Sequence, residues 1–105
     1  MVKIGRKLNP VDHEKPYKVL IDGIPVFDIC ENEIKNINIE AGKHKIQVKS
    51  DKYVSNVLEF ESTNEGIIEF VVEPDYTDNM ISKFFTNVLY NKVGLKLSLK
   101  NEIYL

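Results

Sequence analysis

Apolar and polar residues alternate in short runs along most of the chain. The clearest run is 43–50, where His44, Ile46 and Val48 occupy every second position and polar residues stand between them. Because successive side chains of a strand point to opposite faces, this alternation predicts half-buried β-strands. Similar runs predict strands at 17–21, 24–27, 34–40, 53–61 and 67–73, and a first edge strand at 2–8.

Turn-forming residues separate these runs. Asp22-Gly23 lies between two apolar runs, and it predicts a two-residue hairpin because both central positions of a type I′ turn need positive φ. Pro25 lacks a backbone N–H, which places its strand at a sheet edge or places the proline near the start of the strand. Residues 9–16 combine two prolines with charged side chains and are expected to form a loop.

The apolar residues follow a different period after Pro74. Six of them recur at helical spacing, and Asp78 is suited to cap the N-terminus, which predicts a helix over 79–91. These six are Met80, Ile81, Phe84, Phe85, Val88 and Leu89. Because β-branched and aromatic residues are common in this segment, a strand over the same residues stays open as the alternative. Alternation returns from Val93, and residues 100–102 predict a turn or bulge.

Together these elements predict one domain over residues 1–105. The expected fold is mainly β: an antiparallel Ig-like or transthyretin-like β-sandwich with one C-terminal helix packed on it. Residues 1–16 would form the leading strand and loop, 17–74 the sandwich core, and 75–105 the helix and terminal strands. The chain length suits a single domain of this kind.

The amino-acid composition argues against some kinds of binding partner and some cellular locations. Lys and Arg number 14 against 16 Asp and Glu, and a net charge of −2 argues against a nucleic-acid partner, which normally demands a basic excess. Cys30 is the single cysteine, so no internal disulfide is expected. The N-terminus lacks the apolar core of a signal peptide, and no apolar run is long enough to span a membrane. We therefore expect a cytoplasmic protein, with a fragment or homologue of a membrane-attached protein as the alternative.

Few residues are suited to catalysis or metal binding. His13 lies in the charged loop, and His44 shares the apolar face of its strand, where hydrogen bonds to backbone groups would fix the adjacent turn. Cys30 has no predicted helix N-terminus or base beside it, and is interpreted as an unreactive thiol. No nucleophile, metal-binding or phosphate-binding motif is present. We therefore predict no catalytic residue, no cofactor, no metal site and no enzymatic activity.

Charged residues are distributed unevenly along the chain. Lysines are concentrated between Lys35 and Lys52, whereas residues 59–78 contain seven acidic residues and no Lys or Arg. Paired carboxylates occur at Glu31/Glu33, Glu59/Glu61, Glu69/Glu73 and Asp75/Asp78. The favoured interpretation is that they lie on the solvated face of a sheet, where basic and acidic strands pair as neighbours. The alternative is that the two groups lie on opposite edges and give the molecule a dipole that steers a partner.

Three segments resemble PEGA-type domains, which are similar to carboxypeptidase-regulatory-like and transthyretin-like bacterial β-sandwiches. They are the hairpin segment 17–23 (YKVLIDG), the turn and strand 41–48 (AGKHKIQV), and the tyrosine at 53 with the strand that follows it to residue 60. The resemblance spans about residues 17–73. It implies a non-catalytic accessory module of the kind often attached to bacterial membrane or cell-surface proteins, and it transfers no active-site residue.

Three hypotheses for function follow. The first is a non-enzymatic β-sandwich module that binds a protein partner or mediates envelope-associated interactions, through an open sheet edge or through the apolar stripe of residues 80–89. The second is a carbohydrate-binding module that uses exposed tyrosines, of which the chain has five: Tyr17, Tyr53, Tyr76, Tyr90 and Tyr104. The third is a small enzyme with a site assembled around His44.

Overall fold

A computed structural model describes residues 1–7, 15–51, 53–74 and 93–103. These residues form one nine-stranded sheet. The strands are β1 (Val2–Arg6), β2 (Tyr17–Ile21), β3 (Ile24–Ile29), β4 (Ile34–Ile37), β5 (Gly42–Lys49), β6 (Val54–Ser55), β7 (Leu58–Ser62), β8 (Ile67–Pro74) and β9 (Val93–Ile103).

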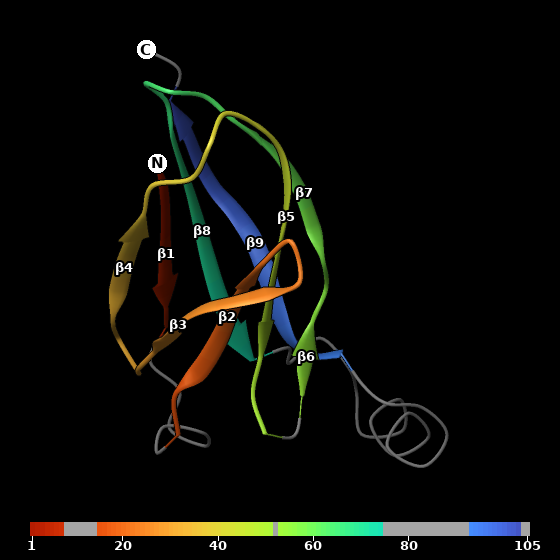
Figure 1. The fold of residues 1–105 in the computed structure, drawn as a ribbon. Helices are drawn as coiled ribbons and strands as arrows, with labels where there is room; N and C mark the ends of the chain where they lie inside the picture. The colour runs from red at the N-terminus through yellow and green to blue at the C-terminus, as the bar shows by residue number, and fades with distance from the viewer. Residues whose placement is uncertain (8–14, 52, 75–92, 104–105) are drawn as a thin grey trace.

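The sheet curls on itself into a nearly closed, barrel-like shape (Figure 1). Its strand order is β3-β2-β5-β6-β9-β8-β1-β4, and β7 pairs with β5 next to β6. Most neighbours are antiparallel, but β1 runs parallel to β8, and β6 runs parallel to β9. The short β6 therefore joins the two halves of the sheet, which run from β3 to β5 and from β9 to β4.

The predicted fold class is wrong in two respects. The described residues form a single sheet with two parallel pairings instead of two antiparallel layers. They also contain no helix, and the C-terminal part of the described chain is the long strand β9. Residues 79–91, for which a helix was predicted, lie outside the described residues.

Most predicted strands are confirmed in position and in the face they bury. Ile46 and Val48 on β5 are fully buried, and so are Phe70 and Val72 on β8. Asp22 and Gly23 have positive φ, as the predicted type I′ hairpin requires. Pro25 lies near the start of β3, which pairs only with β2 among the described strands. The register shift opposite Glu69 leaves Lys100 as an extra residue in β9, which confirms the predicted bulge.

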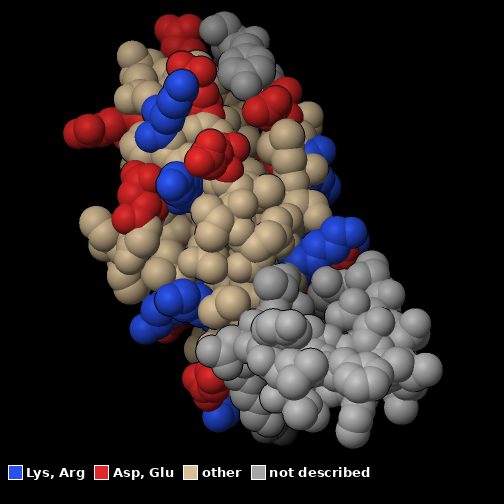
Figure 2. All heavy atoms as spheres, turned by 90° about the vertical axis from the view of Figure 1, so that its right-hand side faces the viewer, with Lys and Arg blue, Asp and Glu red and all other residues tan. Residues whose placement is uncertain are grey.

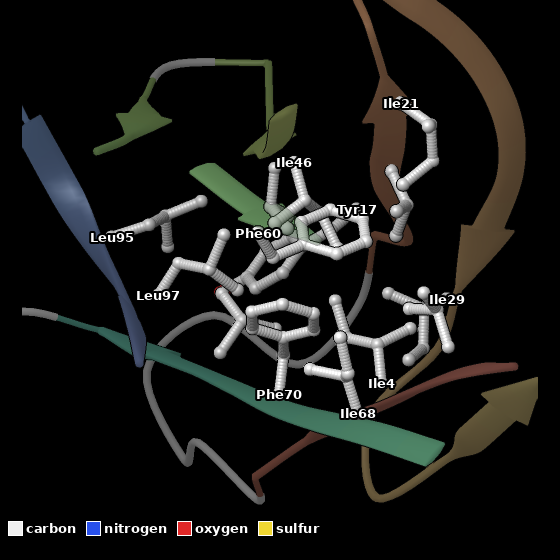
Figure 3. Close-up of a cluster of buried hydrophobic side chains, with 14 residues drawn as sticks. Ile4, Tyr17, Ile21, Ile29, Ile46, Phe60, Ile68, Phe70, Leu95 and Leu97 are labelled. Atoms are coloured by element: carbon white, nitrogen blue, oxygen red, sulfur yellow. The ribbon is translucent and has the colours of Figure 1, made fainter. Parts of the chain in front are cut away.

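β1 is a strand, but the prediction that it lies at an edge is wrong. It pairs with β4 on one side and with β8 on the other. Val2 and Ile4 are buried in the core, together with Phe70 of the neighbouring β8 and Tyr17 of β2 (Figure 3). A short run at the start of the chain gives no indication of the distant strands that pair with it.

Arg6 places a cation inside the curled sheet. Its side chain continues the inward face of Val2 and Ile4 and is only 2% exposed. The guanidinium carbon lies 3.6 Å from the centre of the Tyr17 ring, and Nη1 donates to the carbonyls of Lys15 and Ile29 at 2.8 and 3.2 Å. Cation–π and charge-assisted hydrogen bonds strengthen when water is excluded. Arg6 therefore connects β1 to the β2 and β3 side of the molecule.

Replacing Arg6 should destabilise the fold strongly. Arg6→Ala removes the hydrogen bonds to two carbonyls and the contact with Tyr17, and we expect it to lower the free energy of unfolding by about 3 kcal/mol. Lys7→Ala is the matched control, because its ion pair with Glu73 is solvent-exposed and contributes less than about 1 kcal/mol. Urea denaturation measures both variants, and equal stabilities of the two would contradict this role for Arg6.

Candidate functional site

The β2–β3 turn is fixed against the start of β5 by its aspartate. The Asp22 amide donates to the Lys45 carbonyl at 2.8 Å, and Asp22 Oδ1 accepts from the Lys45 amide at 2.9 Å. Asp22 Oδ2 lies 2.6 Å from His44 Nδ1. The left-handed conformation of Asp22, with φ of 54°, lets its carboxylate turn back toward β5.

Both ring nitrogens of His44 are engaged. Nε2 lies 2.8 Å from the Glu40 carbonyl oxygen, which can only accept, so Nε2 carries a hydrogen. The hydrogen bond to Asp22, with that to Glu40 second, raises the pKa of His44 above its ordinary value of 6.5. The hydrogen bond from His44 and the Lys45 amide lower the pKa of Asp22 below 3.8. The pair is therefore an imidazolium beside a carboxylate.

This geometry gives His44 a positioning role at the turn. An imidazolium with both N–H groups hydrogen-bonded has no lone pair to accept a proton or to bind a metal. The hydrogen bonds join the turn after β2, the loop before β5 and β5 itself. Within the described ranges, no three His, Cys, Asp or Glu side chains converge as a metal site would require.

A surface cavity of about 460 Å³ lies at the same place. It is lined by Asp22, Lys43, His44, Lys45, Glu59, Phe60 and Glu61. Phe60 is paired with His44 across β5 and β7, and their ring centres are 5.9 Å apart. The cavity thus combines two rings from the inward face with charged residues that neighbour them on the two strands.

Lysines and glutamates face one another on the outer side of this β5–β7 ribbon. Lys43 is opposite Glu61, and Lys45 is opposite Glu59 with 3.9 Å between Nζ and Oε1. This confirms, for these strands, the interpretation that the basic and acidic segments pair as neighbours. Figure 2 views the side on which β7 lies and shows an uncharged area bordered by Lys, Asp and Glu side chains.

β7 has a backbone edge that no described strand covers. The backbone N–H and C=O of Lys45 point toward Asp22. Because the backbone groups of successive strand residues point to opposite edges, those of His44 and Ile46 point toward β7. Phe60 and Leu58 complete those pairs, and the N–H and C=O groups of Glu59 and Glu61 therefore point away from β5. Among the described strands β7 pairs only with β5.

Asn56 bonds to the edge of β9 just beyond the end of β6. Its side-chain amide donates to the Leu97 carbonyl and accepts from the Leu97 amide, both at 2.9 Å. The pairing of β6 with β9 extends only to Leu95, and β9 then runs away from β7 (Figure 1). The Asn56 side chain thus makes the hydrogen bonds to Leu97 that the backbone of a paired strand would otherwise make.

Leu99 shows the consequence of this divergence. It pairs with the buried Phe70, and so it lies on the inward face of the sheet, yet it is 49% exposed. Phe70 also contacts Phe60, with the ring centres 5.3 Å apart in an edge-to-face arrangement. Leu99 is therefore an exposed apolar side chain on the inward face of β9, the strand whose pairing with β6 ends at Leu95. Its neighbours Leu95 and Leu97 point into the core (Figure 3).

The remaining predicted site residues do not assemble into a centre. Cys30 is exposed in the turn between β3 and β4, where its amide donates to Glu33 Oε1. Glu69 and Glu73 face Lys100 and Lys7, at 3.3 and 3.2 Å. His13 and the pair Asp75/Asp78 lie outside the described residues.

The tyrosines do not form an exposed platform in the described part of the chain. Tyr17 is buried beneath Arg6, and Tyr53 is 37% exposed. Tyr76, Tyr90 and Tyr104 lie outside the described residues. No observation here favours a carbohydrate ligand.

Comparison with known proteins finds no match: no family model, curated protein or solved structure is significantly similar to this chain. The resemblance to PEGA-type domains therefore stays a prediction. Within the described residues there is also no helix with the length and apolar character needed to cross a membrane.

The Asp22–His44 pair predicts a defined pH dependence. Because folding raises the pKa of His44, its stabilising effect is complete below pH 6.5 and is lost as the pH rises through the higher, folded-state pKa. The effect of Asp22 is present above pH 3.8 and is lost as the pH falls through its lowered pKa. The wild type should therefore lose stability as the pH rises above 6.5.

Asp22→Asn tests this account, because asparagine tolerates the left-handed conformation and still accepts from the Lys45 amide. We expect the variant to lower the His44 pKa in an NMR titration and to flatten the decline in stability above pH 6.5. Asp28→Asn, at an exposed position on β3, is the control and should change neither. An unchanged His44 pKa in Asp22→Asn would contradict the assignment.

Proposed function

We propose that this protein is a non-enzymatic binding module that accepts an extended segment of a partner protein as an additional strand on β7. The observation that carries the proposal is the edge of β7, whose N–H and C=O groups at Glu59 and Glu61 point away from β5 and pair with no described strand. Leu99 on β9 adds an exposed apolar side chain on the inward face of the sheet. Strand addition uses such an edge for affinity and the adjoining apolar positions for specificity.

The dimensions of the edge suit a short segment. β7 comprises five residues, and two of them direct backbone groups outward, which allows up to about four hydrogen bonds to a partner strand. The backbone N–H and C=O of Leu97 point toward Asn56. Because backbone groups alternate along a strand, those of Leu99 point to the same side of β9. A docked segment would thus lie between the edges of β7 and β9 and continue the sheet from β7 toward β9.

The underlying scaffold is ordered on its other side. β5 pairs with β2 over residues 46–49, and the contacts of Asp22 with Lys45 and His44 extend this connection into the part of β5 that pairs with β7. An edge strand held in this way needs little rearrangement to bind, which limits the entropic cost of association.

A peptide selection tests the proposal. Peptides selected from a random phage-displayed library on the folded protein should perturb the NMR signals of Glu59, Glu61 and Leu99. Glu61→Pro should weaken their binding at least tenfold, because proline removes an outward-pointing N–H and keeps the inner ladder with β5. Glu61→Ala, which keeps the N–H, is the matched control and should retain binding.

Urea denaturation of Glu61→Pro verifies that the variant is folded. Two results would refute strand addition on β7. One is selected peptides that perturb only residues distant from β7, and the other is undiminished binding by folded Glu61→Pro.

A further inference from the structure

We infer that the segment that docks on β7 belongs to a partner protein and alternates basic with apolar side chains, and that it is not the β7 strand of a second copy of this chain. The inference rests on the proposed strand addition. It follows from three observations. The side chains of β7 that point outward are acidic, and the residues near its edge that point inward are apolar. The acidic side chains also disfavour the pairing of β7 with a second β7.

The outward charges of β7 are acidic and accessible. The Glu59 side chain is 79% exposed and its ion pair with Lys45 spans 3.9 Å, so it retains access to a second cation. Glu61 is exposed and lies opposite Lys43. On a docked strand, the residues directly opposite Glu59 and Glu61 also point outward. Basic side chains there would place each glutamate between two cations, whereas acidic ones would repel it.

The inward positions of the docked strand require apolar side chains. The residue opposite Phe60 would point inward, toward the side of the sheet that holds Phe70. Leu99, the cross-strand partner of Phe70, is 49% exposed on that same side. An apolar side chain that packs against Leu99 would remove water from its exposed surface. A charged side chain there would lose its hydration without a partner.

The β7 strand of a second copy does not satisfy these requirements. Antiparallel pairing of β7 with itself about Phe60 places Glu59 opposite Glu61 at two positions. A shift of two residues in either direction places Glu59 opposite Glu59, or Glu61 opposite Glu61. Like charges directly opposite one another destabilise a strand pair, so each of these registers is disfavoured.

Two synthetic peptides test the inference. The probes are the N-acetylated, C-amidated heptapeptide Lys-Val-Lys-Val-Lys-Val-Lys and its counterpart with Glu in place of each Lys. We expect the wild-type protein to bind the lysine peptide about tenfold more tightly at β7, and the preference to shrink in 1 M salt. NMR perturbation of Glu59, Glu61 and Leu99 identifies binding at this edge.

A charge-exchanged variant provides the matched control. Lys43→Glu/Lys45→Glu/Glu59→Lys/Glu61→Lys keeps opposite charges at both cross-strand positions and inverts the outward charge of β7. It should prefer the glutamate peptide by about tenfold. If this variant does not fold, Glu59→Gln/Glu61→Gln replaces it and should bind both peptides about equally.

The outcomes separate this inference from the proposed function. If library peptides bind at β7 but the charge-altered variant keeps the preference of the wild type, the basic-partner inference is overturned and strand addition stands. If no peptide of either kind binds at β7, both are overturned. Reversal of preference in the charge-exchanged variant, with loss of binding in Glu61→Pro, is the result expected.

Discussion

The two hydrogen bonds of Asn56 to Leu97 mark the point at which the two halves of the curled sheet stop pairing. By bonding both backbone groups of Leu97, the Asn56 amide satisfies the edge of β9 with a side chain in place of a strand. β6 has by then joined the two halves of the sheet, and β7 continues along β5 while β9 turns away. Without this divergence, β7 would lie between two strands, and its backbone would offer nothing to a partner. The open edge, the exposure of Leu99 and the proposed function all depend on it.

The rest of the molecule holds that edge in a fixed position. Arg6, buried against Tyr17, connects β1 to the β2–β3 half across the interior. On the neighbouring side, Lys35 donates to the Asp28 carbonyl at 2.6 Å and so links β4 to β3, which do not pair with each other. The hydrogen bond between Asp22 and His44 connects the β2–β3 turn to the start of β5. A polar contact therefore links β3 to β4, the two terminal strands of the sheet, whereas β7 pairs only with β5 among the described strands.

Much of the strand pattern was predictable because alternation records which face of a strand is buried. His44 was correctly expected on the inward face at a turn, although its main partner, Asp22, is 22 residues away and no spacing indicates it. The closure of the sheet was not predictable, because the parallel pairing of β1 with β8 joins segments that are far apart in the sequence, such as Val2 and Ile68. Two local signals in the sequence mark these features. Asn56 interrupts an apolar position in the predicted strand 53–61, and Arg6 occupies an inward position of the first strand.

Hydrogen exchange of the free protein tests the central claim most directly, since it asks whether the edge of β7 is open. The amides of Glu59 and Glu61 should exchange rapidly, because they point away from β5. The amides of Leu58 and Phe60 should be protected by the ladder with β5. This alternation along a single strand is the predicted result. Protection of Glu59 and Glu61 equal to that of Phe60 would mean that another part of the molecule covers the edge, and would contradict the account.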